Sequence, residues 1–150
     1  MNCYILFGCP GCGKSYYIKS KQLYSNTICY DKIRHKYNEI NNEKIYEKFY
    51  KQIETYLKNN KNDLYIDMVL YNYNQFYRIK SLCDKYKYNI IFIDFTNISL
   101  EKCINRNSKR NTNNKVDNNA INYMYNNIIK LKDILKNNYK FIKVKENDNE

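Results

Sequence analysis

The fold is decided by the stretch Gly8-Cys9-Pro10-Gly11-Cys12-Gly13-Lys14-Ser15, which holds all three glycines and the one proline of the chain. It has the form G-x-x-x-x-G-K-[ST]. Between a strand and a helix, such a loop turns its backbone N–H groups toward phosphate oxygens, and the helix dipole adds to the attraction. The apolar run 3–7 precedes it as an expected strand, and an expected helix follows. The stretch, called the phosphate loop below, therefore predicts binding of a nucleoside triphosphate.

The phosphate loop also assigns roles to single residues. We expect Lys14 to reach the β- and γ-phosphates of ATP, and the Ser15 hydroxyl to ligate Mg²⁺. The expected ATP-binding residues of this region are Gly8, Cys9, Pro10, Gly11, Cys12, Gly13, Lys14, Ser15 and Tyr16. The same stretch contains a C-x-x-C pair, Cys9 and Cys12, which elsewhere indicates redox chemistry or half a zinc site. A zinc site would need a second such pair, and a redox role remains a minor hypothesis.

Outside the loop, short apolar runs alternate with segments of helical period, which is typical of a mainly parallel sheet covered by helices. Buried helix faces are expected around 45–57, 76–86 and 121–135, the last beginning after Asp117 as its N-cap. The prediction is an α/β P-loop kinase fold in one domain, 1–150, with a flexible tail at about 146–150. The expected strands are 3–7, 27–30, 63–67, 89–95 and 140–144.

Arginine is more informative than lysine in this sequence. The net charge is +11, which would favour polyanionic partners, but an A- and T-rich coding bias would also enrich Lys without any such role. Only four arginines occur, Arg34, Arg78, Arg106 and Arg110. Lys cannot replace the planar, permanently charged guanidinium group of Arg, so these four positions are considered separately.

An acceptor site is expected after the second strand. Asp31 follows that strand, and Arg34 lies one turn further if a helix begins there. Because carboxyl ends of parallel strands border the ligand crevice, Asp31 would accept the proton of an attacking hydroxyl and Arg34 would bind a neighbouring phosphate. Asp67, which ends the third strand, would orient the acceptor or influence Mg²⁺ through water. The plainer interpretation is a helix-start Asp with a surface ion partner, and Asp94 is interpreted as structural.

A basic lid is expected at about 105–116, before the last helix. Arg106 and Arg110 are four residues apart there, so on a helical turn both guanidinium groups project to one side. A lid arginine would stabilise charge developing between the β- and γ-phosphates of ATP. The alternative is an ordinary solvated loop with two solvated cations.

Three blocks together carry a resemblance: the phosphate loop, Asp31-x-x-Arg34, and Arg106-Asn107-Ser108-Lys109-Arg110. In order and spacing the chain resembles the kinase domain of phage-type polynucleotide kinases, and the resemblance takes in Asp67. It implies that Lys14 and Ser15 bind ATP and Mg²⁺, and that Asp31 is the general base. It further implies that Arg34 grips the phosphate 3′ of the attacked hydroxyl and that Arg110 contacts the transferring phosphoryl group. Cys12 stands where the family more often has a small Ser or Ala, and Asn111 and Asn113-Asn114 occupy a lid region that often carries Gly.

The expected reaction is transfer of the ATP γ-phosphate to the 5′-hydroxyl end of single-stranded or nicked DNA or RNA. One alternative is a kinase of the same fold that acts on a nucleoside, nucleotide or sugar nucleotide. Another is a nucleic-acid-binding module without turnover. No apolar run is long enough to span a membrane, and the six cysteines lack the spacing of a secreted disulfide scaffold. We expect an intracellular, soluble, stand-alone kinase with reduced thiols, and a separate phosphatase or ligase is a candidate partner.

Overall fold

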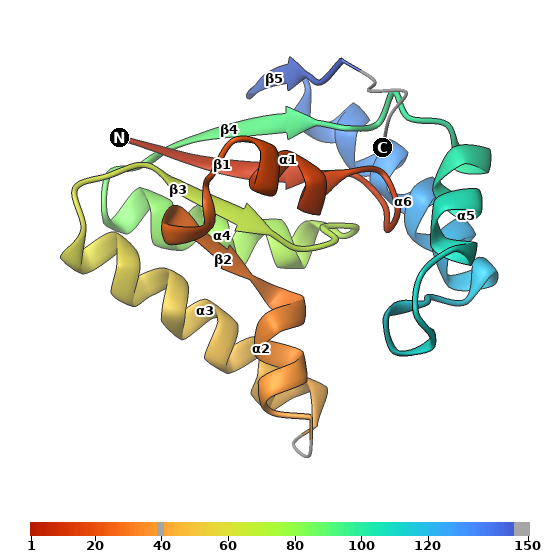
Figure 1. Ribbon diagram of the computed structural model, residues 1–150. Coiled ribbons are helices and arrows are strands. Elements are labelled where there is room, and N and C mark those ends of the chain that lie inside the picture. Colours follow the sequence, from red (N-terminus) through yellow and green to blue (C-terminus); the bar gives the residue numbers. More distant parts are fainter. Residues whose placement is uncertain (39–40, 146–150) are drawn as a thin grey trace.

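The computed structural model describes residues 1–38 and 41–145. Their centre is a five-stranded sheet in the order β2-β3-β1-β4-β5 (Figure 1). All four strand pairs are parallel. The strands are β1 Asn2–Phe7, β2 Thr27–Cys29, β3 Leu64–Asp67, β4 Asn89–Asp94 and β5 Lys140–Lys143.

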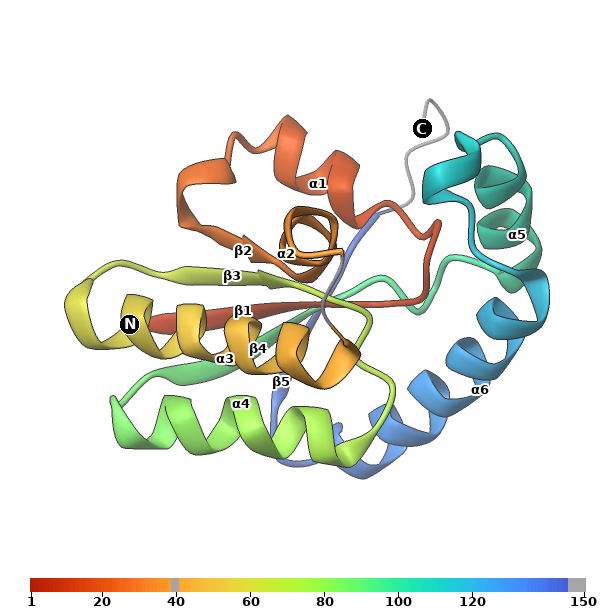
Figure 2. The same ribbon diagram turned by 90° about the horizontal axis from the view of Figure 1, so that it is seen from below.

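Helices cover both faces of the sheet. Helices α3 and α4 lie side by side beneath it, whereas α1 lies on the opposite side and α5 with α6 closes one end (Figure 2). The helices are α1 Lys14–Ser20, α2 Tyr30–Lys36, α3 Asn42–Asn59, α4 Tyr73–Lys85, α5 Leu100–Ser108 and α6 Asn118–Leu135, with short 3₁₀ turns at Tyr24–Asn26 and Thr112–Asn114.

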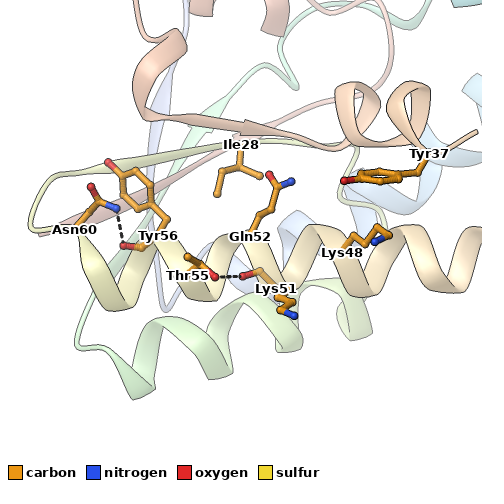
Figure 3. A pocket seen from close by; sticks show the side chains of 8 residues that line it. All are labelled: Ile28, Tyr37, Lys48, Lys51, Gln52, Thr55, Tyr56 and Asn60. Atoms are coloured by element: carbon orange, nitrogen blue, oxygen red, sulfur yellow. Dashed lines mark hydrogen bonds between the residues drawn. The ribbon is translucent and has the colours of Figure 1, made fainter.

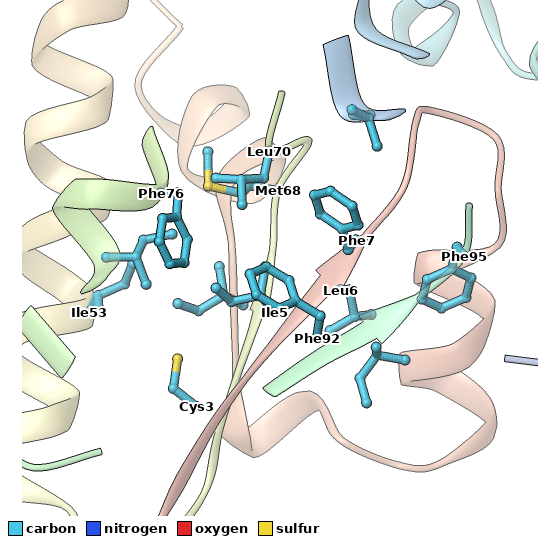
Figure 4. Close-up of a cluster of buried hydrophobic side chains, with 14 of the residues drawn as sticks. Cys3, Ile5, Leu6, Phe7, Ile53, Met68, Leu70, Phe76, Phe92 and Phe95 are labelled. Atoms are coloured by element: carbon cyan, nitrogen blue, oxygen red, sulfur yellow. The ribbon is translucent and has the colours of Figure 1, made fainter. Parts of the chain in front are cut away.

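Strand β1 is buried on both faces of the sheet, so the core extends above and below it. Its side chains alternate between the faces of the sheet, and Cys3, Ile5, Leu6 and Phe7 have no exposed surface. Phe7 packs edge-on against Phe92 at 5.3 Å between ring centroids. Figure 4 shows Leu6 on the side of α1 and Phe95, with Ile5 on the side of Phe76. A strand buried on both faces needs the near-continuous apolar run seen in the sequence.

Side-chain caps begin four of the helices. Asn41 accepts from the N–H of Lys44, and Ser99 accepts from that of Lys102. Helix α4 has a complete capping box formed by Asn72 and Gln75. Such caps satisfy N–H groups that have no partner within the helix. Asp117, predicted to cap the last helix, does so by accepting from the N–H of Asn119 at 2.8 Å.

The predicted α/β P-loop kinase fold is confirmed, including all five strands to within one or two residues. The lid expected at about 105–116 overlaps α5, which continues to Ser108. Asn107 is buried in that overlap. The tail expected at 146–150 lies outside the described residues. Within the described part of the chain, no helix is long and apolar enough to cross a membrane.

Candidate active site

The phosphate loop follows β1 directly and packs closely against neighbouring residues. A Cβ atom on Gly8 would lie 2.6 Å from the Cys12 Sγ and 2.8 Å from the Phe95 Cβ. A Cβ on Gly11 would lie 2.5 Å from the Cys103 carbonyl oxygen of α5. Gly11 and Gly13 also have φ angles of 86° and 107°, which favour glycine. The three glycines are therefore required by close packing and by the turns that begin α1.

Lys14, the first residue of α1, is only 7% exposed. Its ammonium donates to the carbonyl oxygens of Gly8 at 2.9 Å and Cys9 at 3.1 Å. Burial lowers the pKa of Lys14, but Cys12 and Asp67 oppose that effect and the net shift is upward. The side chain is thus held charged inside the concave side of the loop, where it can meet phosphate oxygens.

Ser15 and Tyr16 follow in the first turn of α1, and both are exposed. The Ser15 hydroxyl is a hard oxygen donor of the kind that Mg²⁺ prefers, and Asp67 supplies a carboxylate at the end of β3. Among the described residues no group of three or more His, Cys, Asp or Glu side chains could hold a metal ion.

The loop thiols are buried and protonated. Burial raises the pKa of Cys12 to about 11. A hydrogen bond with Cys103 of α5 is the main cause that raises the pKa of Cys9. Thiolates near a helix N-terminus were the basis of the redox hypothesis. The direction of both shifts is opposite to what that hypothesis requires.

Asp67 lies between the phosphate loop and the predicted acceptor residues, which are the two halves of the candidate site. In the sheet register it is paired with Leu6 of β1 on one side and with Cys29 of β2 on the other. It is 8% exposed, and its Oδ2 accepts from the Cys29 Sγ at 3.5 Å. Burial raises the pKa of Asp67, while Lys14 acts to lower it and Asp31 to raise it. Asp67 therefore interacts electrostatically with both the phosphate loop and the predicted acceptor residues.

The predicted acceptor pair is at the start of α2, immediately after β2. Asp31 lies in the first turn, and its Oδ1 is 3.3 Å from the Arg34 guanidinium. The side chains of Asp31 and Arg34 are 67% and 45% exposed. The pair is thus accessible to solvent. Because the strands are parallel, it lies at the same end of the sheet as the point where β1 leads into the phosphate loop.

The predicted lid arginines lie near the phosphate loop. Arg106 of α5 donates to the Gly11 carbonyl oxygen at 3.4 Å. Arg110 is past the end of α5, close enough for its charge to act on the pKa of Lys14 by lowering it. The structure thus places Arg106 against the phosphate loop and Arg110 near Lys14.

Asn107 holds the lid segment in place, and the sequence did not single it out. It is 1% exposed, its amide donates to the Val116 carbonyl at 2.6 Å, and its oxygen accepts from the Val116 N–H at 2.9 Å. These two bonds close residues 108–115 into a loop whose ends meet. The position beside Arg106 was the only signal in the sequence. Cys103, against Gly11, was likewise missed.

Asp94 has a structural role, as interpreted from the sequence. It is 4% exposed, accepts from the backbone and hydroxyl of Thr96, and is 2.7 Å from the Lys132 ammonium. These contacts join the end of β4 to α6. Buried charge of this kind is normally paired.

Fold and loop together define the architecture of a P-loop kinase. Among solved structures, the chain is similar to a deoxyadenosine kinase from M. mycoides, described with products dCMP and a flexible dCDP bound. The similarity has a TM-score of 0.56 at 16% sequence identity, and covers 97% of this chain and 90% of that one. The sequence matches no protein-family model and no curated protein. At this identity the likeness concerns the fold alone.

Proposed function

We propose that this protein is an ATP-dependent polynucleotide 5′-hydroxyl kinase. The observation that carries the proposal is the exposed pair Asp31 and Arg34, joined through Asp67 to the buried Lys14. A hydroxyl acceptor needs a base, and a nucleotide that follows it brings a phosphate. Both groups are available one helical turn apart on an open surface, where the end of a polymer can enter.

The donor side would be the phosphate loop. Its backbone N–H groups and Lys14 bind the triphosphate, and Arg110 approaches the transferred phosphoryl group from the lid. Ser15 would hold Mg²⁺, which would neutralise charge on the triphosphate. The protein's own contribution is to fix the triphosphate against a loop that is already formed.

On the acceptor side, Asp31 accepts the proton of the 5′-hydroxyl as its oxygen forms a bond to the γ-phosphorus. The bond from that phosphorus to the β–γ bridging oxygen breaks, and ADP leaves with its electron pair. Arg34 binds the phosphate on the 3′ side of the attacked nucleotide. None of these contacts addresses a base, so the activity would be independent of sequence.

A second candidate is a kinase that phosphorylates a nucleoside, nucleotide or sugar nucleotide. The similarity to a deoxyadenosine kinase favours it over the polynucleotide assignment. Arg34 would then bind a different phosphate or a sugar. A module that binds nucleic acid without turnover is a weaker third candidate, because Lys14, Ser15 and Asp31 are all in place.

The test is direct. Purified protein is incubated with γ-labelled ATP and Mg²⁺, separately with a 5′-hydroxyl oligonucleotide, with deoxynucleosides and with nucleoside monophosphates. We expect label on the oligonucleotide and none on an otherwise identical oligonucleotide that already has a 5′-phosphate. Label only on the small molecules would reject the proposal in favour of the second candidate.

Asp31→Asn is the matched control for catalysis. It keeps the shape of the side chain and removes the base, so the oligonucleotide should bind but not be phosphorylated. If the parent and the variant both bind single strands and neither transfers label to any acceptor, the non-catalytic module is correct.

A further inference from the structure

A groove lies between α3 and the edge formed by β2 and α2 (Figure 3). Its volume is about 490 Å³. Tyr37, the C-cap of α2, stands at one end, Ile28 comes from β2, and the other lining side chains follow α3 to its C-cap. The lining residues are Ile28, Tyr37, Lys48, Lys51, Gln52, Thr55, Tyr56 and Asn60.

The chemistry of this groove suits a polyanion. Lys48 and Lys51 provide positive charge, the other polar groups are neutral, and none of the eight described lining residues is acidic. A second groove of about 390 Å³ on the α4 side of the same helix shares Lys51 with the first, but it is different because Glu47 and Glu54 also line it. Glu54 there is paired with Lys85 at 2.9 Å. One helix thus separates a basic groove from a mixed one.

The basic groove is linked to the predicted acceptor pair along the chain. Tyr37, at one end of the groove, is three residues after Arg34 and directly follows α2. The Tyr37 ring has the Lys48 ammonium 4.4 Å and the Lys36 ammonium 5.4 Å from its centroid. A cation beside an aromatic ring is the combination with which proteins hold the phosphate and the base of one nucleotide.

We infer that this groove binds the single-stranded part of the acceptor that follows its 5′-terminal nucleotide. The inference rests on the proposed function and specifies its substrate as a strand of several nucleotides. Lys48 and Lys51 contact phosphates, and Tyr37 stacks on a base. From Lys48 to Asn60 α3 rises about 18 Å, which matches several stacked nucleotides at about 3.4 Å each.

The test measures binding of 5′-hydroxyl oligothymidylates of 2 to 12 nucleotides, labelled with fluorescein at the 3′ end, by anisotropy without ATP. We expect Kd to fall with length and to level off once the groove is filled. Lys48→Ala combined with Lys51→Ala should weaken binding of an octamer about tenfold or more and leave the dinucleotide unchanged. The slope of log Kd against log salt should fall by about 1.4, since each phosphate contact on a single strand contributes about 0.7.

A matched control removes two lysines elsewhere. Lys130 of α6 and Lys140 of β5 are exposed and do not line the groove. Lys130→Ala combined with Lys140→Ala changes net charge equally, so an effect of the general field would weaken octamer binding in both double variants. Equal weakening would overturn the inference.

Substitutions of Tyr37 test whether its ring stacks on a base of the bound strand. Tyr37→Ala should weaken octamer binding about tenfold, whereas Tyr37→Phe should keep it, because the ring and not the hydroxyl stacks. Loss in both variants would contradict stacking at this position.

Failure of the inference and failure of the proposed function give different results. If oligonucleotides are phosphorylated but KM is independent of length and of Lys48 and Lys51, the function stands and the groove is not used. If nothing is phosphorylated but length-dependent binding is lost in the double variant, the groove stands and the kinase assignment fails. If oligonucleotides do not bind at any length, both are rejected.

Discussion

The two halves of the site are built differently. On the donor side the phosphate loop is buried, Lys14 is bonded to loop carbonyls, and a Cβ on Gly8 or Gly11 would collide with neighbouring residues. On the acceptor side Asp31 and Arg34 are exposed side chains that contact each other. Under the proposed function, the donor would be recognised mainly by fixed backbone, whereas the acceptor would be recognised by side chains on an open surface.

This contrast has a physical reason. A triphosphate has one shape, so a preformed loop can match it and avoid reorganisation during the reaction. The proposed acceptor, the end of a nucleic-acid strand, would have to enter and leave with the rest of the polymer attached, which an enclosed pocket would prevent. Asp67 is the link between the halves, because it is buried and interacts electrostatically with both Lys14 and Asp31.

Lys14→Met should have the largest effect and should be confined to the donor half. It removes the ammonium but keeps an apolar stem of similar length, so we expect kcat to fall at least about 10³-fold with an unchanged circular dichroism spectrum. Oligonucleotide affinity, measured by anisotropy, should stay at the parent value. Lys19→Met, at an exposed position of the same helix, is the control. Lost oligonucleotide binding in Lys14→Met would show that the halves are not separate.

Arg110→Ala should lower kcat about 10³-fold, the lower end of the effect of an arginine that stabilises the transferring phosphoryl group. Because Arg110 is exposed and outside α5, its removal should leave the melting temperature unchanged. The neighbouring Lys109→Ala, which removes the same charge, should retain activity within a few-fold. Equal losses in the two variants would mean that only the general charge of the lid matters.

Asp31→Asn and Arg34→Gln should affect different kinetic constants, although both residues belong to the acceptor half. Asp31→Asn should lower kcat about 10²-fold or more through loss of the base, whereas Arg34→Gln should mainly raise the KM for the oligonucleotide, about tenfold. Neither should change stability much, since exposed ion pairs contribute little. Steady-state kinetics with both substrates varied gives the answer. A rise in the KM for ATP in either variant would contradict the separation.

Asn107→Ala should loosen the lid without touching a substrate. The change removes both hydrogen bonds to Val116 from a buried position, so the free energy of unfolding should fall by about 1–3 kcal/mol. With Arg110 less well placed, kcat should fall about tenfold while the KM for the oligonucleotide stays constant. The exposed Asn105→Ala is the control. Reduced stability with full kcat would make Asn107 purely structural.

The sequence predicted the parts of this protein that depend on local pattern. The five strands followed from apolar runs, and the phosphate loop followed from glycine and lysine spacing. Asn107 could not be predicted, because its importance comes from a partner at Val116 that only the folded α5 brings near. The same holds for Cys103, whose carbonyl leaves no room for a side chain on Gly11. Long-range contacts of this kind have no periodic signature.

The smallest expected effect concerns the thiols of the donor half. Since burial raises the pKa of Cys12 to about 11, the thiol is neutral in the folded protein. The neutral Cys12 thiol contributes in full to the free energy of unfolding below the pKa of the thiol in the unfolded chain, about 8.5. This contribution is lost as pH rises toward 11. The rate of alkylation of Cys12 by iodoacetamide should therefore rise steadily between pH 8 and 11, while that of a cysteine peptide levels off near pH 9. Mass spectrometry of the labelled peptide measures both.

For the same reason mild peroxide at pH 7 should leave ATP affinity unchanged, because the reactive species is the thiolate. Isothermal titration before and after treatment is the measurement, with a Cys9→Ala variant as the control for any slow oxidation. Weakened ATP binding that dithiothreitol restores would revive a redox switch at Cys9 and Cys12. It would also show that the donor half is less rigid than its buried loop indicates.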